Sequence, residues 1–228
     1  MVEFIKTKGN AKMADMTFNQ QAFNEFILNN KVIKEFDKPI TLKSGKQSTI
    51  YVNWRTVAED AYLMNIVTDF VLDFASHLKL PIDTFYGVQE GATKLGVLTQ
   101  FKFAQQQQWQ AGSHTLAMGR AKPKEHGDPK DRYFVGAPTG NICVLEDVTT
   151  TGGSLINCIN DLQAAGMTIT AAIGLTNRDE FRDDGKTVKD ALADLNVPYY
   201  EMSNAKVLLN KLSTSGVNQE GTAKQNRS

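Results

Sequence analysis

Hydrophobic side chains recur every three or four positions in several parts of the chain, which is the spacing that places them on one face of an α-helix. The clearest such segment covers residues 61–78. Residues 18–30 carry Phe23, Phe26 and Ile27 on one face. The same spacing predicts further helices over residues 92–108, 155–165 and 187–195.

Short apolar runs predict strands between these helices. Two of them, over residues 32–42 and 48–54, bracket the basic connection Lys43-Ser44-Gly45-Lys46 and indicate a hairpin. Because the later runs alternate with helices, we predict an α/β fold with a mostly parallel central sheet flanked by helices on both faces. Ligands bind such sheets at the carboxyl ends of the strands. These later runs cover residues 84–88, 115–118, 141–145 and 170–175.

Composition and charge argue against several classes of protein. The 228 residues suit one domain with a small attached subdomain, and 41% hydrophobic and 22% charged residues are ordinary for a soluble globular protein. The 25 basic and 25 acidic residues cancel, which argues against nucleic acid as the main partner. No apolar run approaches the roughly 20 residues that span a bilayer, so no membrane partner is expected.

The cellular compartment follows from similar features. Residues 1–16 lack the apolar core of a secretory signal. Cys143 and Cys158 fall in a predicted buried strand and the helix after it, where they suit small apolar fillers better than a disulfide. We therefore expect a cytoplasmic protein, with flexible termini over residues 1–16 and 213–228.

Residues 142–154 carry the strongest chemical signal. Four apolar residues lead into Glu146 and Asp147, and a loop rich in Thr, Gly and Ser then leads into a helix. Backbone N–H groups and the positive end of the helix dipole attract phosphate at such a place, and glycines let the backbone approach it. The two acids can accept hydrogen bonds from ribose hydroxyls or reach a metal ion through water. An ordinary tight turn with a helix cap is the alternative, but two adjacent carboxylates repel each other and favour a functional site.

The segment resembles the phosphoribosyl-pyrophosphate (PRPP) motif of type I phosphoribosyltransferases. The resemblance implies the fold of that family, a mostly parallel sheet flanked by helices with a small N-terminal hood subdomain. It also implies that Glu146 and Asp147 hold the ribose hydroxyls. The residues that would cradle the 5′-phosphate are Thr149, Thr150, Thr151, Gly152, Gly153 and Ser154.

A second strand–loop–helix turn covers residues 87–96. A plain connection is one interpretation of it, but two phosphate-type loops at two strand ends would serve a 5′-phosphate and a pyrophosphate together. The turn resembles the pyrophosphate loop of the same family, which implies that Gln89, Glu90 and Gly91 bind pyrophosphate through backbone N–H groups. Several members of the family have a lysine where this chain has Tyr86.

A basic segment runs from Arg120 to residue 132 between two predicted elements. Its proline, glycine and mixed charges predict a mobile loop. One interpretation is a solvated loop without a further role. Mobility is also what a lid needs if it must close over a polyanion. The cations Arg120, Lys122 and Lys124, together with His126, suit a pyrophosphate leaving group. In this family Arg-Lys often opens the loop, whereas here Ala121 follows the arginine.

Two further segments indicate a subfamily. Residues 41–53 resemble the N-terminal signature of orotate phosphoribosyltransferases: Leu-Lys-Ser-Gly, then Ser, then an aromatic strand ending in Asn. A surface hairpin with a buried Tyr51 is the alternative. Arg178 follows a predicted strand end and could be a surface arginine paired with Asp179 or Glu180. The resemblance instead implies that Arg178 binds the orotate carboxylate, and that the orotate site also contains Lys43, Tyr51 and Thr150.

The resemblance implies the transfer of a phosphoribosyl group from PRPP to orotate, with Lys124, His126 and Asp147 as the catalytic residues. Mg²⁺ would be the cofactor, held mainly by PRPP and water rather than by a protein metal site. A homodimer is implied, with the loop over residues 120–132 shared across its interface. The implied division is a hood over residues 17–56 and a PRPP-binding core over residues 57–212.

Two rival interpretations stay open at this point. The first is a phosphoribosyltransferase for another base, such as a purine; Lys43 and Arg178 weigh against it, because neutral purines do not need those cations. The second is a PRPP-sensing regulator that binds nucleic acid and performs little catalysis. The neutral charge balance and the intact basic loop weigh against the regulator.

Overall fold

The computed structural model describes residues 18–41, 47–107, 109–120, 122, 124–126 and 132–210. The two termini expected to be flexible, residues 1–16 and 213–228, lie outside the described residues. Within the described residues no helix combines the length and the apolar character needed to cross a membrane.

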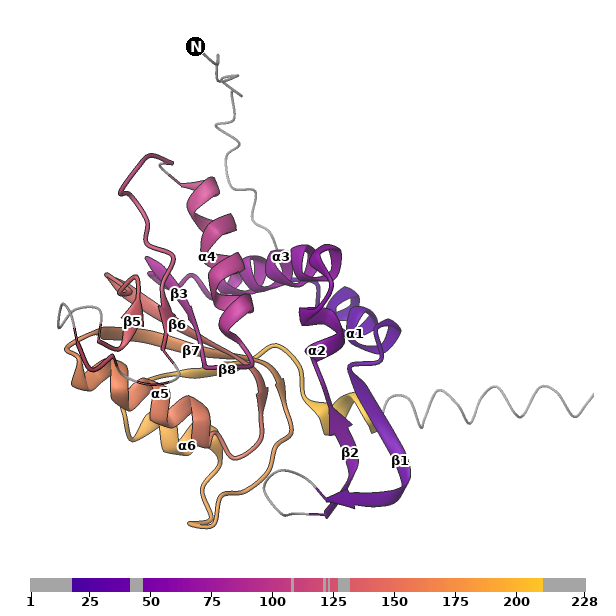
Figure 1. Cartoon of the computed structure of the whole chain (residues 1–228). Coiled ribbons are helices and arrows are strands. Elements are labelled where there is room, and N and C mark those ends of the chain that lie inside the picture. The colour runs from indigo at the N-terminus through magenta and orange to yellow at the C-terminus, as the bar shows by residue number, and fades with distance from the viewer. Residues whose placement is uncertain are drawn as a thin grey trace, which may run out of the picture.

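A four-stranded parallel sheet forms the centre of the molecule (Figure 1). Its strand order is β3 (Thr84–Gly87), β6 (Asn141–Thr149), β7 (Thr168–Asn177) and β8 (Tyr199–Glu201), and each neighbouring pair is parallel. The predicted α/β fold with a mostly parallel sheet is therefore confirmed. Because all four strands run in the same direction, their carboxyl ends meet at one edge.

Helices cover both faces of this sheet (Figure 1). Helices α3 (Ala61–Leu78) and α4 (Thr93–Gln106) lie on one face, and α5 (Gly153–Ala164) and α6 (Val188–Ala193) lie on the other. Helix α1 (Gln20–Asn29) packs against α3 beside the sheet. Successive strand residues point to opposite faces, so Phe85 and Cys143 join the first core while Tyr86 and Ile142 join the second. The sheet thus has a buried apolar layer on each side, and Cys143 is a fully buried filler as predicted.

The predicted helices over residues 18–30 and 61–78 are confirmed as α1 and α3. Each begins at a side chain that accepts a hydrogen bond from a first-turn N–H group: Asn19 from Ala22, and Asp60 from Leu63. Phe23, Phe26 and Ile27 are buried on the inner face of α1, as their spacing predicts.

The N-terminal hairpin packs at the side of the sheet (Figure 1). Strands β1 (Ile33–Thr41) and β2 (Gln47–Val52) pair antiparallel, with a register shift between Glu35 and Ile40. The short helix α2 (Arg55–Ala58) follows them. Trp54 joins the two, and its indole Nε1 donates a hydrogen bond to Thr176 Oγ1 at 3.1 Å. The hairpin is thereby attached to β7, the strand that ends at the predicted ligand edge.

The structure corrects one strand prediction. Residues 115–118 do not join the main sheet, because β4 (Met118–Gly119) pairs antiparallel with β5 (Phe134–Val135) in a separate two-stranded ribbon. The reason is that Leu116 and Met118 are exposed and only Ala117 is buried, so the segment has too little inward-facing apolar surface for a central strand.

Three smaller differences concern element ends. Strand β6 continues through the acidic pair to Thr149, because its ladder with β7 extends to the pair Thr149 and Asn177. The helix predicted over residues 155–165 is α5, which ends at Ala164, and Ala165 just beyond it is exposed. Strand β8 was missed, since three residues after Pro198 are too few to show a periodic pattern.

We predict that Phe23→Ala lowers the free energy of unfolding by about 3–5 kcal/mol, the usual cost of emptying a buried aromatic site. Phe23 is fully buried, and its ring centroid lies 6.0 Å from that of Trp54 and 5.2 Å from that of Phe70. Urea unfolding checks the value. Tyr62→Ala, at a side chain on α3 that is 73% exposed, is the control and should change stability by less than about 0.5 kcal/mol. Equal losses in the two variants would contradict the packing role.

Candidate functional site

The loops that follow β3 and β6 meet at the carboxyl edge of the sheet. A β-carbon on Gly91 would lie 2.9 Å from Asp147 Oδ1, so the loop after β3 passes directly over the acidic pair. The backbone N–H of Val88 also donates to the Leu145 carbonyl at 2.9 Å. The structure therefore brings together the predicted pyrophosphate loop and the two acids. The peptide bond between Gln89 and Glu90 in this loop is cis.

The acidic pair is asymmetric. Asp147 is half-buried, and its Oδ1 accepts a hydrogen bond from the Val148 N–H at 2.8 Å. Glu146 is only 7% exposed, and burial, followed by the neighbouring Asp147 carboxylate, raises the pKa of Glu146 to about 9. Glu146 is therefore uncharged at neutral pH in the ligand-free protein. The repulsion expected between adjacent carboxylates is removed by this proton, which also makes Glu146 a hydrogen-bond donor.

The two helices that follow these loops begin without a side-chain cap. Ala92 precedes α4 and Gly152 precedes α5, and neither makes a side-chain hydrogen bond to the helix. Asn19, Asp60 and Thr187 cap α1, α3 and α6, while the four-residue helix α2 also lacks a side-chain cap. First-turn N–H groups of a helix that lacks a side-chain cap can bind an anion, and the helix dipole favours negative charge there. Two such helix ends follow the loops that meet at the acidic pair, and the interpretation that they bind two phosphate groups stays a prediction.

The loop between β6 and α5 has the predicted shape with one exception. Gly152 has a φ of +76°, a conformation that glycine adopts without strain, and a β-carbon there would overlap Val188 Cγ2. Thr150 and Thr151 are half-buried, while Gly153 and Ser154 are exposed. Thr149 is the exception: it is 1% exposed, and its hydroxyl lies against Gly174 beside the Tyr199 hydroxyl. The Thr149 side chain therefore faces the protein interior, because the residue is still part of strand β6. The place of Thr149 in the predicted phosphate cradle stays a prediction.

Arg178 lies directly after β7, as predicted, but it is a buried residue rather than a surface one. Its side chain is 8% exposed and forms an ion pair with Glu180 at 2.9 Å. Its Nη2 also donates to Ser48 Oγ at 3.0 Å and to the Ile50 carbonyl at 3.1 Å, both on β2. Among the described residues, its Nε has no hydrogen-bond partner.

The structure describes some of the other residues of the predicted base site. Tyr51 is half-buried on β2, and its ring centroid lies 6.4 Å from that of Phe36. Lys43 lies outside the described residues. Sequence reasoning missed Ser48 as a partner of Arg178, because the contact joins positions 130 residues apart.

The basic segment continues from the β4–β5 ribbon. The Arg120 N–H donates to the Tyr133 carbonyl at 2.9 Å, and the Lys124 N–H donates to the Arg132 carbonyl at 2.8 Å. Lys122, Lys124 and His126 are exposed. Ala121, Pro123 and residues 127–131 of the predicted loop lie outside the described residues.

A cavity of about 590 Å³ lies between this ribbon and α5. Its lining includes Gln89, Arg120 and Ser154, one from each of three predicted site segments. Tyr86 also faces this cavity, and it is 1% exposed with its hydroxyl accepting a hydrogen bond from Gln89 Nε2 at 3.2 Å. In the part of the chain that the structure describes, no three His, Cys, Asp or Glu side chains gather closely enough to hold a metal ion.

Comparisons with known proteins place this arrangement among its relatives. No family model matches the chain. The orotate phosphoribosyltransferase of a Bradyrhizobium species is 30% identical over 151 residues, which cover 62% of this chain and 75% of that protein. The crystal structure of the orotate phosphoribosyltransferase from Aeropyrum pernix has a TM-score of 0.62 and 21% identity, covering 84% of this chain and 98% of the other. That of Mycobacterium tuberculosis, in complex with PRPP, has a TM-score of 0.56 and 14% identity over 83% and 98% of the two chains.

We predict that the free energy of unfolding falls as pH rises from about 5 to 9, and that it falls less steeply in Glu146→Gln. Across this range the folded protein keeps a proton on Glu146, whose pKa is raised from 4.5 to about 9, whereas the unfolded chain has released it. Stability therefore decreases with pH, by up to about 1.4 kcal/mol per pH unit from this one group. Urea unfolding of the ligand-free proteins at several pH values measures the difference. Parallel pH dependences would contradict the burial argument.

We predict that Gly152→Ala lowers the free energy of unfolding by about 2 kcal/mol or more. The left-handed conformation costs an alanine about 1–2 kcal/mol, and its β-carbon would also overlap Val188. Gly153→Ala is the matched control, because a β-carbon at Gly153 meets nothing within 4 Å. Chemical unfolding of both variants tests the difference, and similar losses would show that the contact with Val188 is unimportant.

Proposed function

The chain belongs to the orotate phosphoribosyltransferase family, and from this we propose that it transfers the phosphoribosyl group of PRPP to orotate, releasing pyrophosphate and forming orotidine 5′-monophosphate. The observation that carries the proposal is the pair of helices without side-chain caps, α4 and α5, on either side of Glu146 and Asp147. PRPP has the matching shape, with a 5′-phosphate and a pyrophosphate at opposite ends of a ribose.

The proposed PRPP site follows from this match. The first-turn N–H groups of α5, with Thr150, Thr151 and Ser154, bind the 5′-phosphate. The loop formed by Gln89, Glu90 and Gly91 binds the pyrophosphate. The ribose lies between the two loops, where the Asp147 carboxylate accepts hydrogen bonds from its hydroxyls and the protonated Glu146 can donate as well as accept. The acids thus hold the sugar while the helix ends hold its phosphates.

The proposed orotate site lies between β2 and the end of β7. Arg178 is held there by Ser48, Ile50 and Glu180. We assign its guanidinium, whose Nε has no hydrogen-bond partner among the described residues, to the orotate carboxylate. A fixed guanidinium is a suitable partner for a carboxylate. Tyr51 and Lys43, from the hairpin, and Thr150 complete this site. An anionic base is thereby selected over a neutral one.

Chemically, the ribose carbon C1 becomes positively charged as pyrophosphate leaves, and the protein must neutralise the leaving group and align the base nitrogen. We assign the first task to Arg120, Lys122, Lys124 and His126, with Lys124 and His126 acting on the pyrophosphate itself. Asp147 holds the ribose while positive charge develops on C1. The hard oxygen donors of this edge suit Mg²⁺, which would enter mainly on PRPP oxygens and water and would neutralise phosphate charge when bound.

The remaining assignments concern organisation. Residues 17–56 form the hood and residues 57–212 the PRPP-binding core. We propose a homodimer in which residues 120–132 of one subunit complete the site of the other. The two free cysteines, Cys143 and Cys158, suit a reducing compartment, and we assign the protein to the cytoplasm.

We predict that purified protein consumes orotate only when PRPP and Mg²⁺ are both present, followed by the ultraviolet absorbance of orotate. Lys124→Ala should lower kcat about 100-fold, which is typical when one charge-stabilising group is lost. Lys189→Ala, at an exposed lysine on α6, is the matched control and should leave kcat unchanged.

The same assay distinguishes the rival functions. Adenine, hypoxanthine and uracil are offered as competing bases, and none should be turned over at a rate comparable to that of orotate. Turnover of one of them in place of orotate would overturn the base assignment and keep the PRPP site. PRPP binding without turnover of any base would indicate a regulator.

A further inference from the structure

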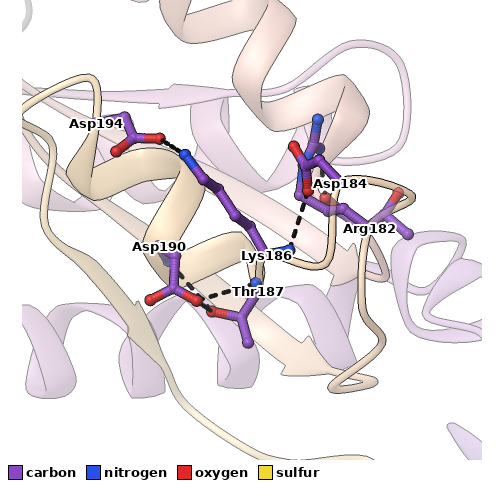
Figure 2. A network of polar contacts seen from close by, with 7 residues as sticks. Arg182, Asp184, Lys186, Thr187, Asp190 and Asp194 are labelled. Atoms are coloured by element: carbon purple, nitrogen blue, oxygen red, sulfur yellow. Dashed lines mark hydrogen bonds and ion pairs between the residues drawn. The ribbon is translucent and has the colours of Figure 1, made fainter.

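The connection between β7 and α6 contains a tight turn that no sequence pattern marks as part of the site. The Arg182 N–H donates to the Lys186 carbonyl at 2.9 Å, and the Gly185 N–H donates to the Arg182 carbonyl at 3.0 Å. Asp184 Oδ1 accepts from the Lys186 N–H at 3.0 Å. These bonds close the turn on itself before the start of α6, and Figure 2 draws the one between Asp184 and Lys186.

The Arg182 side chain leaves this turn and reaches the loop before α5. Its Nη1 donates a hydrogen bond to the Thr151 carbonyl at 2.9 Å, joining positions 31 residues apart. Its Nε lies 3.4 Å from Asp184 Oδ2, within the turn. The two ends of the guanidinium therefore connect the turn to the loop that is proposed to bind the 5′-phosphate.

The start of α6 contacts the same loop. Thr187 and Asp190 form a reciprocal cap, in which Asp190 Oδ2 accepts from the Thr187 N–H at 3.0 Å and Thr187 Oγ1 accepts from the Asp190 N–H at 3.2 Å (Figure 2). The next residue, Val188, is the one that a β-carbon on Gly152 would overlap. Thr151 and Gly152 are thus held from one side by two contacts of the β7–α6 connection.

The direction of these contacts matters for an anion. A trans peptide unit is planar, so its carbonyl and its N–H point in opposite directions. Fixing the Thr151 carbonyl toward Arg182 therefore directs the Gly152 N–H away from Arg182, across the loop.

We propose that Arg182 is a positioning residue for the phosphate-binding loop: it orients the peptide between Thr151 and Gly152 so that the Gly152 N–H faces the 5′-phosphate. Its positive charge also favours a phosphate dianion close by. The inference rests on the proposed function, because the phosphate site is itself part of that proposal.

The test compares Arg182→Ala, Arg182→Lys and the control Lys186→Ala. Lys186 lies in the same turn and pairs with Asp194 at 2.5 Å, so its removal takes away a neighbouring cation without touching the loop (Figure 2). Arg182→Ala should raise the KM for PRPP about 10-fold, the usual effect of losing one hydrogen bond from a charged group, and leave the KM for orotate unchanged. Arg182→Lys should show an intermediate KM for PRPP, and Lys186→Ala should match the wild type.

A binding measurement separates positioning from turnover. Calorimetric titration with ribose 5-phosphate should show an affinity about 10-fold weaker in Arg182→Ala than in the wild type and the control. Asp184→Asn weakens the ion pair that holds Arg182 within the turn. This variant should lose less affinity for ribose 5-phosphate than Arg182→Ala, and it replaces Arg182→Ala in the test if that variant does not fold.

Two failures are distinguishable. An active wild type whose KM for PRPP and affinity for ribose 5-phosphate are the same in Arg182→Ala, or in Asp184→Asn if the former is unfolded, would overturn the role of Arg182 alone. A wild type that neither turns over orotate nor binds ribose 5-phosphate would overturn the proposed function, and this inference with it.

Discussion

Strands β6 and β7 stay hydrogen-bonded beyond their apolar residues, with Val148 opposite Thr176 and Thr149 opposite Asn177. Because the strands are parallel, both end at the same edge of the sheet, and the Arg178 N–H donates to the Thr149 carbonyl at 2.8 Å. The loop after β6 and Arg178, which we propose for the phosphate and base sites, therefore start from neighbouring positions. The ladder thus sets the relative position of Thr149 and Arg178, and the loops of the site continue from a rigid sheet edge.

Burial and ion pairing determine the charge of the acidic and basic side chains at this edge of the sheet. Burial beside Asp147 raises the pKa of Glu146 to about 9, which favours its protonated, neutral form. That arrangement reduces repulsion toward a polyanionic substrate. Arg178 is buried too, but the ion pair with Glu180 offsets part of its loss of hydration. The ligand-free site thus combines a neutral acid, a paired cation and two positive helix ends.

The hairpin is tied to the same strand through two separate contacts. Trp54 donates to Thr176 Oγ1, which also accepts a hydrogen bond from Ser203 Oγ at 3.0 Å. Arg178, two residues later, donates to Ser48 and to the Ile50 carbonyl on β2. A shift of the hairpin would therefore disturb Arg178, and with it the base site that we propose.

Local periodicity and short motifs predicted the parallel α/β architecture, the helices α1 and α3, and the segments that we propose to carry the site, because these signals depend on neighbouring residues. They also indicated that two phosphate-type loops belong together. The folded chain was needed to show that Thr149 turns its hydroxyl inward, that Arg178 is buried against Ser48, and that residues 115–118 leave the main sheet. The contact between Arg182 and Thr151 also became visible only in the fold. These outcomes depend on the register of the strands and on contacts between positions 31 to 130 residues apart, and no local pattern carries that information.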